Sequence, residues 1–162
     1  MDRRQLIYHG ACAGASLSLP LARLRAEAIK KTGLAEVYKD YFKLGTAIST
    51  KTLSGENPSI LHLIAREFNA ITAENAMKWS SIHPSHDRWN WGLCDKFVNF
   101  GRANSMLMIG HTLVWHKHTP SSLFTDRGKL ISPKKLYKRL GNHISTVMDR
   151  YKAYIAVWDV VN

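Results

Sequence analysis

Three short apolar runs in this sequence each end in polar and aromatic side chains. The runs begin near residues 69, 106 and 153, and the groups that close them include Glu74, Trp115 and Asn162. A near-continuous apolar stretch of this length is typical of a parallel strand that is buried on both faces. In strand–helix–strand folds, the residues at the carboxyl ends of the strands face the ligand. The pattern therefore predicts one shared site at one edge of a parallel sheet.

Segments with helical spacing separate the strand-like runs. The predicted strands cover residues 42–48, 69–72, 106–112 and 153–161, and the predicted helices cover residues 29–41, 58–68, 94–104 and 132–151. Pro58 suits the first turn of one helix, and Ser132 suits the N-cap of another. Alternation of this kind favours right-handed strand–helix–strand units and an α/β fold with a parallel sheet.

The length of 162 residues limits how much of a barrel the chain can hold. A closed (β/α)8 barrel typically needs about 250 residues, so four strand–helix units are the most that fit. Such a half barrel leaves its first and last strands as unpaired edges. We therefore expect the chain to be incomplete, or unstable on its own.

Four segments, in this order, resemble the first half of glycoside hydrolase family 10, the endo-β-1,4-xylanases. These segments are Leu44–Ala47, Thr72–Trp79, Gly110–His116 and Trp158–Asn162. The resemblance implies a (β/α)8 TIM barrel, of which residues 27–162 would form the first four β/α units. It also implies retaining hydrolysis of internal bonds in xylan. No cofactor is implied, because carboxyl groups carry out this chemistry.

Glu74, Asn75 and Lys78 place an acceptor, a mixed donor–acceptor and a donor within five residues. Such a group can bracket neighbouring hydroxyls of a sugar ring. The resemblance implies that these residues bind the two sugars on the non-reducing side of the cleaved bond. The alternative is an ordinary Glu–Lys pair, four residues apart, at the start of a helix.

His111 and Trp115 would form the floor of the same site, with an apolar indole face beside a polar imidazole. A core histidine and a packed tryptophan are the alternative. Together with His116 and His118, His111 also raises the possibility of a metal site, but no acidic or cysteine ligand completes a zinc motif. We therefore predict no metal. The family usually has Gln where this chain has His118.

Asn162 matches a family residue that supports the sugar 2-hydroxyl, and the family pattern continues from it directly to the general acid/base glutamate. The family nucleophile lies on a later strand. We expect both glutamates to be missing from this chain, so no catalytic residue is assigned and the chain alone is predicted to be inactive. Glu74 and Asp159 are carboxylates near strand ends, but the resemblance gives neither of them a catalytic role.

The formal net charge of +11 does not by itself predict a nucleic-acid partner. The lysines and arginines are scattered, and several lie on the predicted helix at 132–151. They lack the basic–aromatic pattern of an RNA-binding module. We expect xylan or xylo-oligosaccharides as partners, neither nucleic acid nor membrane, and a monomer at full length.

Residues 1–26 resemble an export signal. Arg3 and Arg4 precede a weakly apolar stretch of small residues, a pattern that also fits a twin-arginine signal. A disordered or helical extension is the alternative. We expect a secreted or periplasmic protein. Cys12 belongs to this segment, whereas Cys94 is expected in the core.

Two further hypotheses remain open at the level of sequence. One is a non-catalytic protein that binds xylan through the same residues, and the other is a metal-dependent barrel hydrolase that uses the histidines. A preference for glucans over xylan also remains open, because one hydroxymethyl group distinguishes glucose from xylose.

Overall fold

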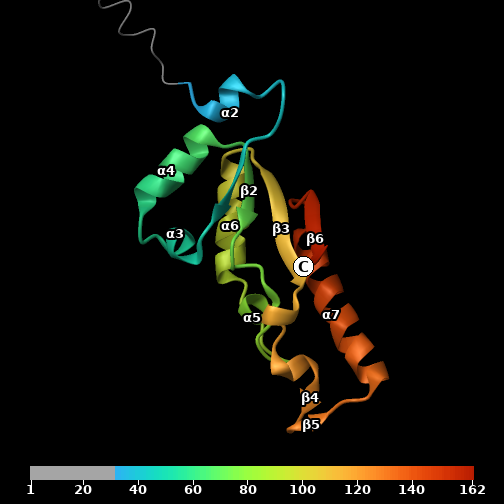
Figure 1. Ribbon diagram of the computed structural model, residues 1–162. Coiled ribbons are helices and arrows are strands. Elements are labelled where there is room, and N and C mark those ends of the chain that lie inside the picture. The colour runs from blue at the N-terminus through green and yellow to red at the C-terminus, as the bar shows by residue number, and fades with distance from the viewer. Residues whose placement is uncertain (1–31) are drawn as a thin grey trace, which may run out of the picture. The chain divides into compact units, whose positions relative to one another are not determined.

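Four parallel strands form one sheet in which spatial order follows chain order (Figure 1). The strands are β1 (Gly45–Ile48), β2 (Ala70–Ala73), β3 (Leu107–Val114) and β6 (Val157–Val161). Each strand pairs in parallel with the next, and β3 pairs with both β2 and β6. The sheet is the open, partial form of the predicted α/β fold.

The structure, a computed structural model, describes residues 32–162. The segment predicted to be an export signal and Cys12 lie outside the described residues. The helices are α2 (Leu34–Val37), α3 (Thr50–Ser54), α4 (Pro58–Glu67), α5 (Trp79–Ile82), α6 (Gly92–Ala103) and α7 (Pro133–Tyr151). Two short 3-10 turns, η1 (His116–His118) and η2 (Ser121–Leu123), and a small hairpin of β4 (Thr125–Asp126) and β5 (Lys129–Leu130) complete the described chain. In the part of the chain that the structure describes, no helix combines the length and apolarity needed to cross a bilayer.

The long helices start where the sequence predicts. Pro58 occupies the first turn of α4, and the Ser132 side chain accepts a hydrogen bond from the backbone N–H of Lys135 to cap α7. The helix predicted over residues 29–41 is wrong in its described part, because α2 has only four residues. Leu34, Val37 and Tyr41 are exposed there. Ala35 is the buried residue of α2, so little apolar packing supports a longer helix, and a short helix is marginal in water.

The core lies where the connecting helices pack on the sheet. Ile71 of β2 and Met108 of β3 face α6, where Gly101 leaves room for them. Cys94 is buried as predicted, and its Sγ donates to the carbonyl oxygen of Ala76 at 3.0 Å. Burial raises the pKa of this thiol to about 12, so Cys94 is an unreactive core residue.

Gly110 is required by the pairing of β3 with β6. Gly110 and Trp158 are register partners, and a Cβ added to Gly110 would lie 2.3 Å from the Trp158 ring. The indole therefore lies directly over the glycine backbone. On the exposed surface of α7, by contrast, a Cβ added to Gly141 would meet nothing within 4 Å.

We predict that Gly110→Ala lowers the free energy of unfolding by about 1–3 kcal/mol, because the added methyl group displaces the Trp158 ring. The matched control, Gly141→Ala, is expected to raise it by about 0.5–1 kcal/mol, because alanine favours a helix interior over glycine. Urea unfolding followed by tryptophan fluorescence measures both. Equal effects of the two substitutions would show that the Trp158 contact is not tight.

Candidate functional site

Backbone hydrogen bonds continue past the strands and bring their carboxyl ends to one edge. The N–H of Glu74, just after β2, donates to the carbonyl of Ile48 at 3.1 Å. The N–H of Asn162, just after β6, donates to the carbonyl of Val114 at 3.0 Å. The ends of all four strands therefore meet at the edge where the sequence predicts the site.

A turn that follows β2 holds three of the predicted residues in a chain of hydrogen bonds. Asn75 Nδ2 donates to Glu74 Oε1 at 3.2 Å, and Lys78 Nζ donates to Asn75 Oδ1 at 2.7 Å. Helix α5 begins only at Trp79, so Glu74 and Lys78 do not lie on a helix. The alternative of an ordinary helical ion pair is therefore wrong.

Lys78 is the most unusual of these residues, because as a lysine it is only 8% exposed. Its ammonium lies 4.7 Å from the centre of the Trp115 ring, which follows β3. Burial of a cation is unfavourable unless polar or aromatic groups compensate it. Asn75 and Trp115 supply that compensation, and they fix Nζ at the strand ends. An ammonium has three N–H donors, so the bond to Asn75 leaves capacity to bind a hydroxyl.

His118 also contacts Trp115. The two rings stack with their centres 4.9 Å apart, and His118 Nδ1 lies 3.2 Å from Ser80 Oγ. Burial, together with the nearby charge of Lys78, lowers the pKa of His118. His118 was not among the predicted site residues, because the family usually has Gln at this position. Its spacing of three residues from Trp115 in a tight turn is the signal that could have identified the contact.

His111 forms a pair with Asp159 across the sheet. The two residues are register partners on β3 and β6, and His111 Nδ1 lies 2.8 Å from Asp159 Oδ2. Thr112 Oγ1 also donates to the Asp159 carbonyl at 2.9 Å. A carboxylate at Nδ1 fixes the ring orientation and leaves Nε2 as the acceptor in the neutral imidazole. Asp159 thus orients a predicted sugar-binding residue, a role that the sequence alone did not reveal.

Asn162 is separate from the hydrogen-bonded cluster. Within residues 32–162, it shares no hydrogen bond with the other five predicted site residues, and its side chain is exposed. With Val114, Leu136 and Val161, it lines an apolar groove of about 510 Å³ beside α7. The structure therefore connects Glu74, Asn75, Lys78 and Trp115 by direct contacts, whereas it brings His111 and Asn162 to the same edge through their strands.

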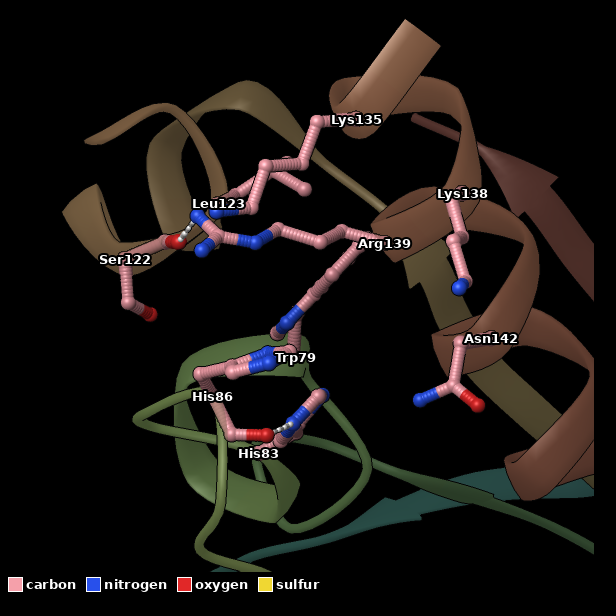
Figure 2. Close-up of a pocket in the computed structure, with 9 residues that line it drawn as sticks. All are labelled: Trp79, His83, His86, Ser122, Leu123, Lys135, Lys138, Arg139 and Asn142. Carbon is pink, nitrogen blue, oxygen red and sulfur yellow. Dashed lines mark hydrogen bonds between the residues drawn. The ribbon is translucent and has the colours of Figure 1, made fainter. Parts of the chain in front are cut away.

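A second cavity, of about 310 Å³, lies between α5 and α7 (Figure 2). None of the six predicted site residues lines it, although Trp79 follows Lys78 directly. Its lining residues are Trp79, His83, His86, Ser122, Leu123, Lys135, Lys138, Arg139 and Asn142. This cavity could not be predicted from local spacing, because its walls come from three separate segments of the chain.

Stacked aromatic rings form the wall behind this cavity. His143 stacks on Trp79 at 3.6 Å between ring centres, and His83 stacks on Trp89 at 3.7 Å. The Nδ1 atoms of the two histidines lie 3.3 Å apart, so one donates and the other accepts. His143 is fully buried. Burial, with a smaller contribution from the neighbouring His83, lowers the pKa of His143 to about 3.

Within the described residues, the histidines do not gather into a metal site. Among residues 32–162, no group of three or more His, Cys, Asp or Glu side chains is placed to hold a metal ion.

Comparison with known proteins supplies the context for this site. The sequence model of glycosyl hydrolase family 10 matches residues 33–162. An endo-1,4-beta-xylanase/feruloyl esterase of Xylanibacter ruminicola is 44% identical over 131 residues, which is 80% of this chain and 18% of that protein. Endo-1,4-beta-xylanase A of Caldicellulosiruptor saccharolyticus is 43% identical over 130 residues, which is 80% of this chain and 37% of that protein.

Solved structures give the same result. An endoxylanase of family 10 from a sugarcane soil metagenome superposes with a TM-score of 0.77 at 47% identity, covering 82% of this chain and 40% of its own. A mutant protein solved in complex with xylotriose superposes with a TM-score of 0.70 at 36% identity, covering 78% and 38%. The chain thus spans less than half the length of these relatives.

We predict that His143 makes the folded state sensitive to acid. Below about pH 6.5 the unfolded chain binds a proton on this imidazole, whereas the folded chain binds it only near pH 3. The free energy of unfolding should therefore fall by roughly 3 kcal/mol from this residue alone between pH 7 and pH 4. Urea unfolding at a series of pH values measures this dependence.

The variant His143→Gln keeps a polar group beside His83 and removes the titrating imidazole. Its free energy of unfolding should therefore fall by roughly 3 kcal/mol less than that of the wild type between pH 7 and pH 4. His62→Gln on the exposed surface of α4 is the control. A pH profile that is the same in wild type and His143→Gln would contradict the assignment.

Proposed function

The chain belongs to glycoside hydrolase family 10, and from this premise we propose that it forms the sugar-positioning half of an endo-1,4-β-xylanase catalytic domain. The observation that carries the proposal is the buried ammonium of Lys78, held by Asn75 at 2.7 Å and by the Trp115 ring at 4.7 Å. This arrangement fixes a hydrogen-bond donor beside an aromatic surface at the strand ends, where barrel enzymes bind their substrates.

The proposed ligand is a xylose unit of β-1,4-xylan on the non-reducing side of the cleaved bond. The pyranose ring packs against the Trp115 indole. Its hydroxyls bond to Lys78 Nζ, to the Asn75 amide and to the Glu74 carboxylate. His111, oriented by Asp159, offers Nε2 to a further hydroxyl. One relative was solved with xylotriose, which supports an oligosaccharide of xylose as the ligand.

The proposed full reaction needs two carboxyl groups about 5 Å apart on either side of the bond, one as acid/base and one as nucleophile. The carboxylates near this edge already have other partners. Glu74 accepts from Asn75, and Asp159 lies against His111. We therefore assign both of them to positioning. In the family pattern, the acid/base glutamate follows the residue that matches Asn162, and the nucleophile lies on a later strand.

The second candidate is a non-catalytic xylan-binding protein. The Lys78 ammonium held by Asn75 and Trp115 also supports this candidate. A sugar can bind to these groups without a catalytic pair of carboxylates. The two candidates differ in whether a complementary half of the barrel supplies hydrolysis.

We predict that Lys78→Met and Trp115→Ala each weaken the binding of xylotriose about tenfold or more, because each removes a contact that holds the sugar. Lys129→Met is the control, since it removes the same charge from the exposed hairpin strand β5. Isothermal titration calorimetry at constant ionic strength measures all three. Equal affinities in Lys78→Met and Lys129→Met would place the sugar elsewhere.

For activity, we expect the purified 162-residue chain to release no reducing sugar from xylan. Mixing it with the remaining half of a barrel from a family 10 relative is expected to restore hydrolysis if the chain is part of an enzyme. Reducing sugar released by the chain alone, and lost on Glu74→Ala, would contradict the positioning role of Glu74.

We further propose that the protein acts outside the cytoplasm, as a monomer that binds polysaccharide and not nucleic acid. Arg3 and Arg4 followed by small apolar residues support export. Residues 1–26 fused to a reporter enzyme should direct it across the inner membrane of a bacterial host, and Arg3→Lys with Arg4→Lys should block a twin-arginine route. A reporter that stays in the cytoplasm would contradict export.

A further inference from the structure

The cavity between α5 and α7 is lined by cations along one side. Lys135, Lys138 and Arg139 reach it from α7, together with the Asn142 amide, and Figure 2 shows these side chains opposite Trp79, His83 and His86. Among the described residues that line it, none is a carboxylate. Burial lowers the pKa of His83, so this imidazole remains an uncharged polar group at neutral pH. The electrostatic character of the cavity is therefore set by three cations.

Arg139 is the buried member of this group, with 8% of its side chain exposed. Its Nη1 donates to the carbonyl oxygens of Ser122 at 2.7 Å and Thr125 at 2.8 Å. Its Nε is buried and has no partner within residues 32–162. Burial of a hydrogen-bond donor on a charged group is unfavourable until an acceptor is supplied.

The neighbouring carboxylate compensates this charge only in part. Asp126 Oδ2 lies 3.8 Å from Arg139 Nη2, is half exposed, and also pairs with Lys135. Three cations against this one carboxylate leave two positive charges in excess. The cavity thus combines an excess of positive charge with room for a small molecule, and the buried guanidinium of Arg139 that lines it is only partly paired.

We propose that this cavity is a binding site for a small ligand that carries an oxyanion, such as a carboxylate or a sulfate. Its oxygens accept hydrogen bonds from Arg139, from the Lys138 ammonium and from the Asn142 amide, which are all suitable donors. The Trp79 and Leu123 side chains give the rest of the ligand an apolar wall. The site is independent of the proposed xylan site, because none of the sugar-positioning residues lines it.

The test uses the full chain and three probes: sodium glucuronate, sodium sulfate and neutral glucose, with ionic strength held constant by sodium chloride. Isothermal titration calorimetry gives the affinity, and thermal unfolding gives the stabilisation by bound ligand. We expect at least one of the two anions to bind and to raise the unfolding temperature, and glucose to do neither. Tighter binding of glucuronate identifies a sugar acid as the source of the anion, and binding of sulfate alone identifies an inorganic oxyanion. Binding of neither anion overturns the proposal.

Two matched variants separate a built site from general attraction to a basic protein. Lys138→Gln removes a lining cation, whereas Lys134→Gln removes an exposed cation of the same helix that does not line the cavity. We expect the first to weaken anion binding about tenfold and the second to leave it unchanged. Equal losses in both variants overturn the proposal.

A third variant adds a negative charge to the cavity and leaves its cations in place. Asn142→Asp places a carboxylate among the lining cations, so it should abolish anion binding and raise the unfolding temperature of the chain without ligand. This position is exposed on α7, so the substitution does not require a change in the core. Unchanged anion affinity in this variant overturns the proposal. None of these anion-binding measurements uses xylan. Their outcome therefore does not depend on whether the proposed hydrolase function is correct.

Discussion

The parallel pairing of β3 with both β2 and β6 is the constraint on which the rest of the structure depends. It brings the turn after β2 next to the residue that follows β3, so that Trp115 can cover the ammonium of Lys78. It also sets His111 opposite Asp159. A shift of one residue in either register would turn every side chain of the strand to the other face. Gly110, covered by the Trp158 indole, keeps β3 and β6 in this register.

Much of this arrangement could be predicted from local sequence. Apolar runs predicted the strands, and Pro58 and Ser132 predicted the starts of α4 and α7. The polar residues that close the runs predicted that these side chains would gather at one edge of the sheet. The roles of Asp159 and His118 could not be predicted in the same way. Asp159 meets His111 across 48 positions of the chain, and His118 meets Ser80 across 38. Such contacts follow from register and packing, which local spacing does not contain. In its described part, residues 32–41, the helix predicted over residues 29–41 was wrong for a related reason, since local sequence does not show how much of a segment finds a surface to pack on.

The turn from β2 into α5 joins two environments of different chemistry. Lys78 faces the strand ends, where neutral hydroxyls are the proposed ligands, and the next residue, Trp79, lines the cavity where an oxyanion is proposed. His143 stacks on Trp79 and is held uncharged by burial, so the wall between the two sites adds no charge of its own at neutral pH. Lysines and arginines spread along the chain give the formal net charge of +11, but the excess of positive charge at this cavity is local and geometrically defined.

The central claim is that xylose units bind at the strand ends, beside Lys78 and Trp115. The most direct test is an NMR titration of the isotope-labelled chain with xylotriose, with the indole N–H signals of the five tryptophans assigned. The account predicts that the Trp115 indole and the backbone signals of Glu74, Asn75 and Lys78 shift together and saturably, while those of Trp89 and Trp91 stay in place. Shifts confined to other tryptophans, or no saturable shift at all, would contradict it.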